Sequence, residues 1–248
     1  MHSPLEQFIV SVLYPLQLFG FDVSFTNAAL YKLVAVAIIT MLMVLGLAGG
    51  RMVPGRWQML TETLYTSISS MVDTAAGPRA RAFFPLIFSI FTFILVGNLV
   101  GILPNTFTFT SHIIVTFGLA AIVFLTVTIT GFAKHGLHFF HLFAPKGAPV
   151  ALLPLLFVLE LFSFCIRPFS LSIRLFANML AGHILMKVFA GMMVMLIGSM
   201  GVYGAVVGVL PTILNICMIG FEFFVALLQA YIFALLSSLY LRDAIEMH

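Results

Sequence analysis

Residues 150–197 read VALLPLLFVLELFSFCIRPFSLSIRLFANMLAGHILMKVFAGMMVMLI, and this long apolar run contains no clear loop. A second run of this kind covers residues 203–241. As single helices the two runs would be about 70 and 57 Å long, whereas the hydrocarbon core of a bilayer is about 30 Å thick. Each run therefore either folds back on itself, with residues 167–174 as the turn of the first run, or forms one steeply slanted helix. Composition alone does not choose between these alternatives.

The rest of the chain shares this apolar character. Of its 248 residues, 62% are hydrophobic and 8% are charged, whereas an average soluble domain has about 25% charged residues. So few polar side chains cannot cover the surface of a soluble fold, and lipid is the expected solvent. The net charge is only +3, and the sequence contains no run of Lys or Arg. Both observations argue against a nucleic-acid partner. Residues 1–18 also lack the basic region of a signal peptide.

The apolar segments predict an all-α polytopic membrane protein with a single membrane domain of about five membrane helices. An external segment, residues 1–29, precedes a first span at residues 30–47. In residues 54–76 the apolar side chains recur at helical spacing, which predicts an amphipathic helix lying along the membrane interface. A hairpin of two spans occupies residues 83–132, and the long pair occupies residues 150–241.

The basic residues that flank the spans indicate the topology. With five spans they all fall on one side of the membrane, and they are Arg51, Arg56, Arg79, Arg81, Lys134, Lys146 and Arg242. The positive-inside rule assigns that side to the cytoplasm. We therefore expect the N-terminus outside and the C-terminus in the cytoplasm.

Ionisable residues inside the two long runs are the candidate functional groups, because each acid, Arg or Lys costs at least about 2.5 kcal/mol at the centre of a span. They are Glu160, Arg167, Arg174, His183, Lys187 and Glu222. Glu160, Arg167 and Arg174 stand seven residues apart, so they lie near one face of a helix. Ser170 and Asn178 lie one turn to either side of Arg174.

The second run repeats this arrangement with Asn215, Glu222 and Gln229, again seven residues apart. Two polar stripes of this kind either line a hydrated path or form interhelical hydrogen-bond seams. Seams explain the neutral residues well. They explain Arg174 and Glu222 poorly, because a guanidinium stays charged and requires an anion or water.

Histidine adds a group that exchanges protons near neutral pH, since the unperturbed imidazole pKa is about 6.5. His183 is therefore either a structural hydrogen-bonded residue or, with Glu222, part of a proton relay. A metal is not expected at His135, His138 and His141, because no acid or Cys completes a ligand set nearby. The chain also contains no phosphate-binding loop or hydrolase motif, so neither a cofactor nor a nucleotide site is expected.

Three stretches resemble a known family. Residues 168–183 read PFSLSIRLFANMLAGH, residues 228–233 read LQAYIF, and residues 97–104 read GNLVGILP. They resemble subunit a of F-type ATP synthases, called subunit 6 in mitochondria, and the resemblance covers most of residues 83–241. The resemblance implies a proton-translocating stator whose last two helices form a steeply tilted pair against the rotating c-ring, and thus favours slanted helices over a fold-back.

The resemblance also implies roles for residues around the ring contact. Arg174 matches the essential arginine that faces the carboxylate of the c-ring. Gln229 matches the glutamine beside that arginine, and Asn178 matches the polar residue one turn on.

Further residues match the two half-channels of the family. Glu160 matches an acidic position in the half-channel that opens to the cytoplasm or matrix. His183 and Glu222 match the pair in the half-channel from the other side, in the mitochondrial arrangement, which suggests an alphaproteobacterial source. Ser170 and Asn215 complete the set of candidate proton-path residues.

The implied partners are the c-ring of subunit c, the peripheral-stalk subunit b, the rest of the ATP synthase complex and the lipid bilayer. The implied location is the bacterial inner membrane, with a periplasmic N-terminus and a cytoplasmic C-terminus, or alternatively the mitochondrial inner membrane. The chain itself is expected to be a non-catalytic proton-channel subunit. The rival interpretation is a self-contained secondary transporter or ion channel, which inverted repeats would favour, and none is visible in the sequence.

Overall fold

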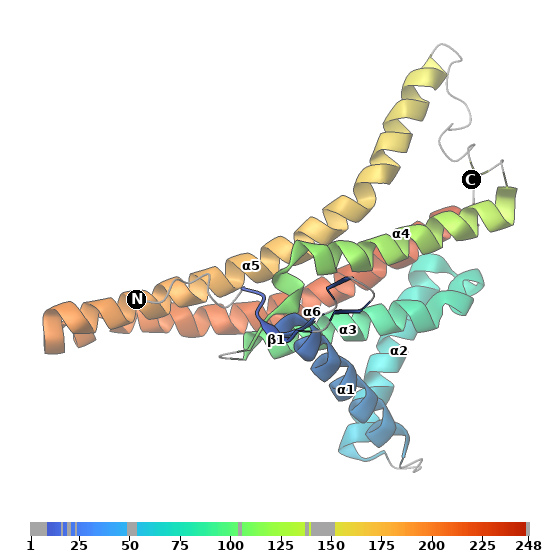
Figure 1. The fold of residues 1–248 in the computed structure, drawn as a ribbon. Coiled ribbons are helices and arrows are strands. Elements are labelled where there is room, and N and C mark those ends of the chain that lie inside the picture. Colours follow the sequence, from blue (N-terminus) through green and yellow to red (C-terminus); the bar gives the residue numbers. More distant parts are fainter. Residues whose placement is uncertain are drawn as a thin grey trace. The chain divides into compact units, whose positions relative to one another are not determined.

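The computed structural model describes residues 9–15, 17–18, 21–22, 24–48, 54–103, 106–136, 139 and 152–246. Six α-helices, α1 to α6, account for most of these residues, which confirms the all-α prediction (Figure 1). The chain divides into two compact units. Unit 1 comprises residues 1–40, 93–112 and 175–230, and unit 2 comprises residues 41–92, 113–174 and 231–248.

Short strands in unit 1 precede the first helix and add to the predicted all-α fold. Strand β1 (Val12–Tyr14) pairs antiparallel with β4 (Phe25–Thr26), and β2 (Gln17–Leu18) pairs antiparallel with β3 (Phe21–Asp22). Asn27 ties the first strand pair to the helix, because its Nδ2 donates to the Ile9 carbonyl at 3.1 Å. Helix α1 (Asn27–Leu47) then begins three residues before the span predicted at residue 30.

Helix α2 (Arg56–Ala76) coincides with the predicted amphipathic helix and begins two residues later. Its buried residues lie on one face of the helix, at offsets of 7, 10, 11, 14 and 15 from the first, and are Thr61, Ile68, Met71, Val72, Ala75 and Ala76. This face packs closely in unit 2, where a Cβ added to Gly46 of α1 would collide with the Thr61 side chain. Among the described residues, five segments are long and apolar enough to cross a bilayer, and α2 is not one of them.

The two spans predicted within residues 83–132 are also present as helices. The 3₁₀ helix η2 (Pro78–Phe83) leads into α3 (Phe84–Ile102), and a loop with the 3₁₀ helix η3 (Phe109–Ser111) leads into α4 (Ile113–His135). The last turn of α4 carries Lys134, whose Nζ donates to the Ile245 carbonyl at 3.0 Å within unit 2. A cation at this position also complements the helix dipole.

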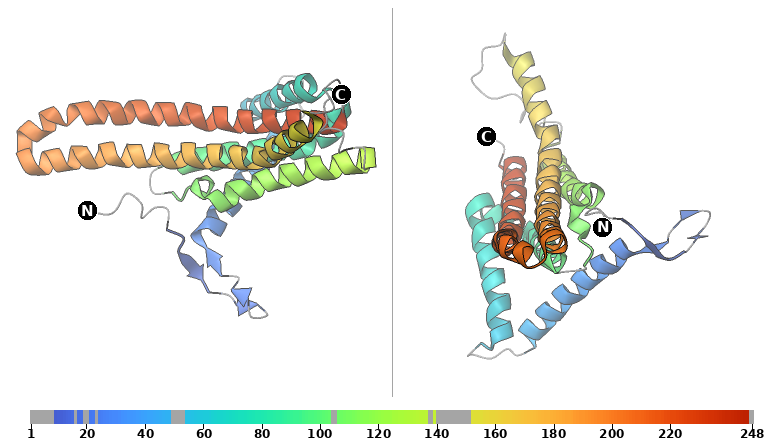
Figure 2. Two further views of the ribbon diagram at one scale, coloured as in Figure 1. Left: turned by 90° about the horizontal axis from the view of Figure 1, so that it is seen from above. Right: turned by 90° about the vertical axis from the view of Figure 1, so that its left-hand side faces the viewer.

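The two long runs form helices α5 (Leu153–Val207) and α6 (Val209–Ile245). Helix α5 continues through residues 167–174, although Pro168 lies inside it, so the alternative of a turn at that stretch is wrong. The chain instead reverses between the two predicted runs, at residues 198–202, where Gly201 adopts φ 57° and ψ −126°, a conformation that glycine tolerates. In unit 1 the orange part of α5 and the first half of α6 then run side by side and antiparallel (Figure 2).

Several sequence predictions fall on residues outside the described ranges. These residues are Arg51, His138, His141 and Lys146.

Candidate functional site

Unit 1 contains a buried acid and imidazole in contact. His183 on α5 and Glu222 on α6 face each other, and 3.4 Å separates His183 Nε2 from Glu222 Oε1. Their side chains are 6% and 2% exposed, respectively. Helical spacing cannot predict this contact, because it depends on the register between the two helices.

A glycine makes room for this pair. A Cβ added to Gly182 would lie 2.8 Å from Glu222 Oε1, closer than such atoms approach in proteins. Among the described residues, neither carboxylate oxygen of Glu222 has a hydrogen-bond partner. A buried carboxylate in this state requires a proton, a charged neighbour or water.

A second polar pair joins the same two helices in unit 1. Asn178 Nδ2 donates to Gln229 Oε1 at 3.0 Å, and Gln229 is 1% exposed. In the described part of the chain the Nε2 of Gln229 and the Oδ1 of Asn215 are buried without a hydrogen-bond partner. Polar groups of this kind are suited to a path that holds water.

The loop after α3 contributes a residue that sequence reasoning missed. Thr108 Oγ1 lies 3.0 Å from His183 Nε2, although 75 residues separate the two along the chain. The only signal in the sequence is the density of hydroxyl side chains at residues 106–111. Directly after this loop, His112 stacks on Phe107 with 5.0 Å between ring centroids. Burial, with a further contribution from the charge of Lys32, lowers the pKa of His112.

Unit 2 surrounds Arg167 of α5 with partners. Its Nη1 donates to Asp243 Oδ2 on α6 at 3.0 Å, and its Nη2 lies 3.8 Å from Glu160 Oε1. The guanidinium carbon also lies over the Tyr240 ring, 4.9 Å from the centroid, and 5.7 Å from the centroid of Phe164. Two carboxylates and two rings thus surround one cation. Glu160 and Arg167 are the members of this cluster that the sequence singled out, and Glu160 is the predicted proton-path residue.

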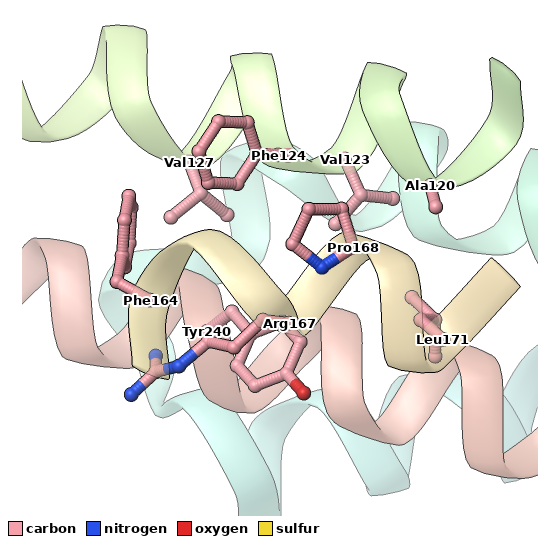
Figure 3. A pocket seen from close by; sticks show the side chains of 9 residues that line it. All are labelled: Ala120, Val123, Phe124, Val127, Phe164, Arg167, Pro168, Leu171 and Tyr240. Carbon is pink, nitrogen blue, oxygen red and sulfur yellow. The ribbon is translucent and has the colours of Figure 1, made fainter. Parts of the chain in front are cut away.

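An apolar pocket adjoins this cation within unit 2 (Figure 3). Its lining side chains come from α4, α5 and α6 and are Ala120, Val123, Phe124, Val127, Phe164, Arg167, Pro168, Leu171 and Tyr240. Arg167 and Tyr240 lie together along one side of the pocket (Figure 3). Since the other linings are hydrocarbon, the pocket offers a polar ligand no group except this arginine and the tyrosine hydroxyl.

Arg174 and Ser170 are exposed on α5. Within the described residues, Arg174 makes no hydrogen bond or ion pair. The structure therefore joins four of the predicted proton-path residues as two pairs, His183 with Glu222 and Asn178 with Gln229, and Arg174, the predicted central cation, is exposed. No group of three or more His, Cys, Asp or Glu suited to a metal occurs in the part of the chain that the structure describes.

Comparisons with known proteins identify the family of this chain. A family model described as "ATP synthase A chain" matches residues 29–242. A protein named "ATP synthase subunit a" from Parvibaculum lavamentivorans is 51% identical over 244 residues, which cover 98% of this chain and 94% of the relative. Proteins of the same name from Bradyrhizobium diazoefficiens and Rhodopseudomonas palustris are 51% and 49% identical, over at least 98% of both chains in each case.

These relatives come from alphaproteobacteria, the group that the order of His183 and Glu222 suggested. Identity of about half of all residues over nearly the full length does not favour the rival interpretation as a self-contained transporter or channel. The chain therefore belongs to the ATP synthase A chain family, as a multi-pass membrane subunit that forms the proton channel in the stator of an F-type ATP synthase.

Proposed function

We propose that this chain provides two offset half-channels to and from a carboxylate on the c-ring, and so couples proton flow to rotation of the ring. The observation that carries the proposal is the buried pair of His183 and Glu222, with 3.4 Å between Nε2 and Oε1. An imidazole and a carboxylate in contact exchange a proton without either group carrying an uncompensated charge in the membrane.

The inlet half-channel runs past this pair. A proton from the outer side passes through Glu222 and His183 and neutralises a ring carboxylate, which can then rotate into lipid. Asn178, Gln229 and Asn215 supply polar atoms to the hydrated path. The hydrogen bond between Asn178 and Gln229 keeps two of these side chains in place.

Arg174 stands between the two half-channels. A guanidinium remains protonated and needs an anion when it leaves water. Arg174 is exposed and has no partner among the described residues, so we assign that anion to the carboxylate of a neighbouring ring subunit. Its fixed charge removes the proton from an arriving carboxylic acid and repels a proton that would cross directly.

The outlet half-channel passes Glu160. This carboxylate is about half exposed and lies at the edge of the Arg167 cluster, so it can accept a proton and release it to water. Ser170, which is exposed on the same helix between Arg167 and Arg174, supplies a further hydroxyl to this side.

The remaining proposals concern assembly. Subunit c and the peripheral-stalk subunit b are the proposed direct partners, and the chain itself is proposed to be non-catalytic. We place it as one membrane domain in a bacterial inner membrane with a periplasmic N-terminus, because the flanking Lys and Arg fall on one side of five spans. Helix α6, with 37 residues, and the part of α5 before Gly201 are both longer than the hydrocarbon core is thick, so the two helices are proposed to lie at a steep tilt against the ring.

Exchange of the inlet pair tests the proposal. His183→Glu combined with Glu222→His should retain more proton-driven ATP synthesis than either single substitution, because the relay needs one acid and one imidazole in contact. The measurement is the initial rate of ATP synthesis in vesicles under an imposed proton gradient. A double variant no better than the worse single variant would show that the two residues are not coupled.

A control separates this proposal from a self-contained transporter. The purified chain reconstituted alone should conduct no protons, whereas the assembled membrane sector should conduct them. Flux through the isolated chain at the rate of the assembled sector would contradict the stator mechanism.

A further inference from the structure

The loop that follows α3 brings a hydroxyl to the buried ring of His183. Thr108 Oγ1 lies 3.0 Å from His183 Nε2, and Thr108 is 3% exposed. The carboxylate of Glu222 faces the same ring nitrogen, with its Oε1 at 3.4 Å. One nitrogen of the imidazole is therefore flanked by a carboxylate on one helix and by a hydroxyl from the loop.

A second acceptor lies within reach of this hydroxyl. Thr108 Oγ1 is 3.3 Å from the carbonyl oxygen of Gly101, near the end of α3. When Nε2 carries no proton, the hydroxyl can donate to it. When Nε2 is protonated, the hydroxyl can accept from Nε2–H and donate its own hydrogen to the Gly101 carbonyl.

We propose that Thr108 is a positioning residue that keeps Nε2 of His183 hydrogen-bonded in both of its protonation states. This inference rests on the proposed role of His183 and Glu222 as the inlet pair. A buried nitrogen that loses its partner is destabilised, so a relay histidine alternating between donor and acceptor needs a neighbour that alternates with it. Among side chains, a hydroxyl can both donate and accept a hydrogen bond at a single oxygen atom. The proton itself moves between His183 and Glu222, and Thr108 only reorients its hydrogen.

Contacts within unit 1 fix Thr108 in this place. The adjacent Phe109 is fully buried and packs on Phe93 of α3, with 5.2 Å between ring centroids. Thr106 Oγ1 donates to the Val100 carbonyl at 2.7 Å, which ties the start of the loop to the same helix. Gly101 leaves the necessary space, because a Cβ there would lie 2.7 Å from Thr108 Cγ2.

Three substitutions at this position separate the hydroxyl from the shape of the side chain. Thr108→Val keeps the shape but neither donates nor accepts, and proton flux through the assembled membrane sector should fall by about tenfold. Thr108→Ser keeps the hydroxyl and should stay within about twofold of wild type. Thr108→Ala should fall between the two, because the vacated space can hold a water molecule that both donates and accepts.

The measurement is proton flux into vesicles that carry equal amounts of assembled complex, under an imposed potential. Thr92→Val is the matched control, because Thr92 is buried on α3 and its hydroxyl donates within its own helix to the Phe88 carbonyl. This variant should conduct within about twofold of wild type. Wild-type flux in Thr108→Val, or a serine variant as slow as the valine variant, would overturn the inference.

A parallel variant distinguishes failure of this inference from failure of the proposed function. His183→Ala should abolish flux whatever Thr108 does. If His183→Ala lowers flux and Thr108→Val does not, only the role of Thr108 is wrong. If both variants conduct like wild type, the inlet pair itself is wrong. If the complex with Thr108→Val does not assemble, the remaining two variants still test the inference, because proton flux should be higher in Thr108→Ser than in Thr108→Ala.

Discussion

Two arginines on α5, seven residues apart, have opposite surroundings within unit 2. Arg167 is held by the carboxylates of Asp243 and Glu160 and by the ring of Tyr240. Arg174 is exposed, and no carboxylate of the described residues pairs with it. The same residue type on the same helix is therefore neutralised by neighbouring carboxylates in one case and left exposed, without a partner among the described residues, in the other.

This difference supports the proposal that Arg167 stabilises the fold whereas Arg174 acts on the rotating ring. A guanidinium that already has two carboxylates has little to gain from a third anion. An unpaired one attracts any carboxylate that reaches it, and the attraction grows in a medium of low dielectric constant. The contrast gives three predictions, in order of decreasing effect.

Removal of the unpaired charge should have the largest effect. In Arg174→Ala, ATP synthesis and ATP-driven pumping should vanish, while passive proton leak through the membrane sector persists or rises, because nothing strips the ring site or blocks the direct path. The measurement is proton flux into vesicles that carry the assembled complex without its catalytic head.

Lysine at the same position is the stricter control. Arg174→Lys keeps a cation but loses the planar fork and can deprotonate when desolvated, so it should also fail at synthesis while leaking less than alanine. If Arg174→Ala vesicles neither leak nor lose synthesis, the two arginines do not differ in role, and Arg174 is only a structural cation.

Removal of the paired charge should act on assembly instead. Arg167→Ala leaves Asp243 and Glu160 without their cation and should destabilise the subunit by about 1–2 kcal/mol, a modest value because Asp243 and Glu160 are about half exposed. Less complex should accumulate in the membrane, but each assembled complex should keep its coupling. The measurement is the ratio of ATP synthesis to assembled complex.

Arg242→Ala is the matched control for this variant, because Arg242 forms an exposed ion pair with Glu246, four residues on. Its effect on the amount of complex should be negligible. Full assembly with lost coupling in Arg167→Ala would mean that Arg167 works like Arg174.

Removal of a neutral hydrogen bonder should have the smallest effect. Gln229→Leu breaks the bond from Asn178, and interhelical bonds in membranes contribute about 0.6 kcal/mol, so ATP synthesis should slow by about threefold without being abolished. Asn178→Leu removes the other half of the bond and should slow synthesis similarly. Rates of ATP synthesis equal to wild type in both variants would show that Asn178 and Gln229 play no part in the mechanism.

Much of the fold follows from the sequence because each span is a long apolar run. Helices α1 to α4 begin or end within about three residues of their predicted bounds. Composition could not decide whether each of the two long runs folds back or forms one slanted helix. Both alternatives contain the same residues and differ only in where those residues lie in the membrane. The strands before α1 are two or three residues long, and segments so short leave no periodic signal.

The sequence indicated the candidate residues and, through the resemblance, the pair of His183 and Glu222, but it did not indicate the partners of Arg167 or the contact of Thr108. Glu160, Arg167 and Arg174 follow one helical repeat, and that repeat cannot tell a paired arginine from an unpaired one. Asp243 lies two residues beyond the predicted end of the last helix, at residue 241, so it was not considered as a partner. Thr108 was missed because a loop has no periodicity that would place its hydroxyl beside a helix.

The reversal at Gly201 sets the alignment of the polar contacts between α5 and α6. The contacts between α5 and α6 in unit 1 join residues 183 and 222, 178 and 229, and 193 and 212. Their midpoints all fall at residues 202–204, directly after the glycine with positive φ. The turn thus fixes the register between the two helices, and the number of residues between the turn and each contact determines which side chains meet. One residue inserted on one arm would rotate that arm by about 100°, so it would separate the polar pairs beyond it while leaving both helices intact.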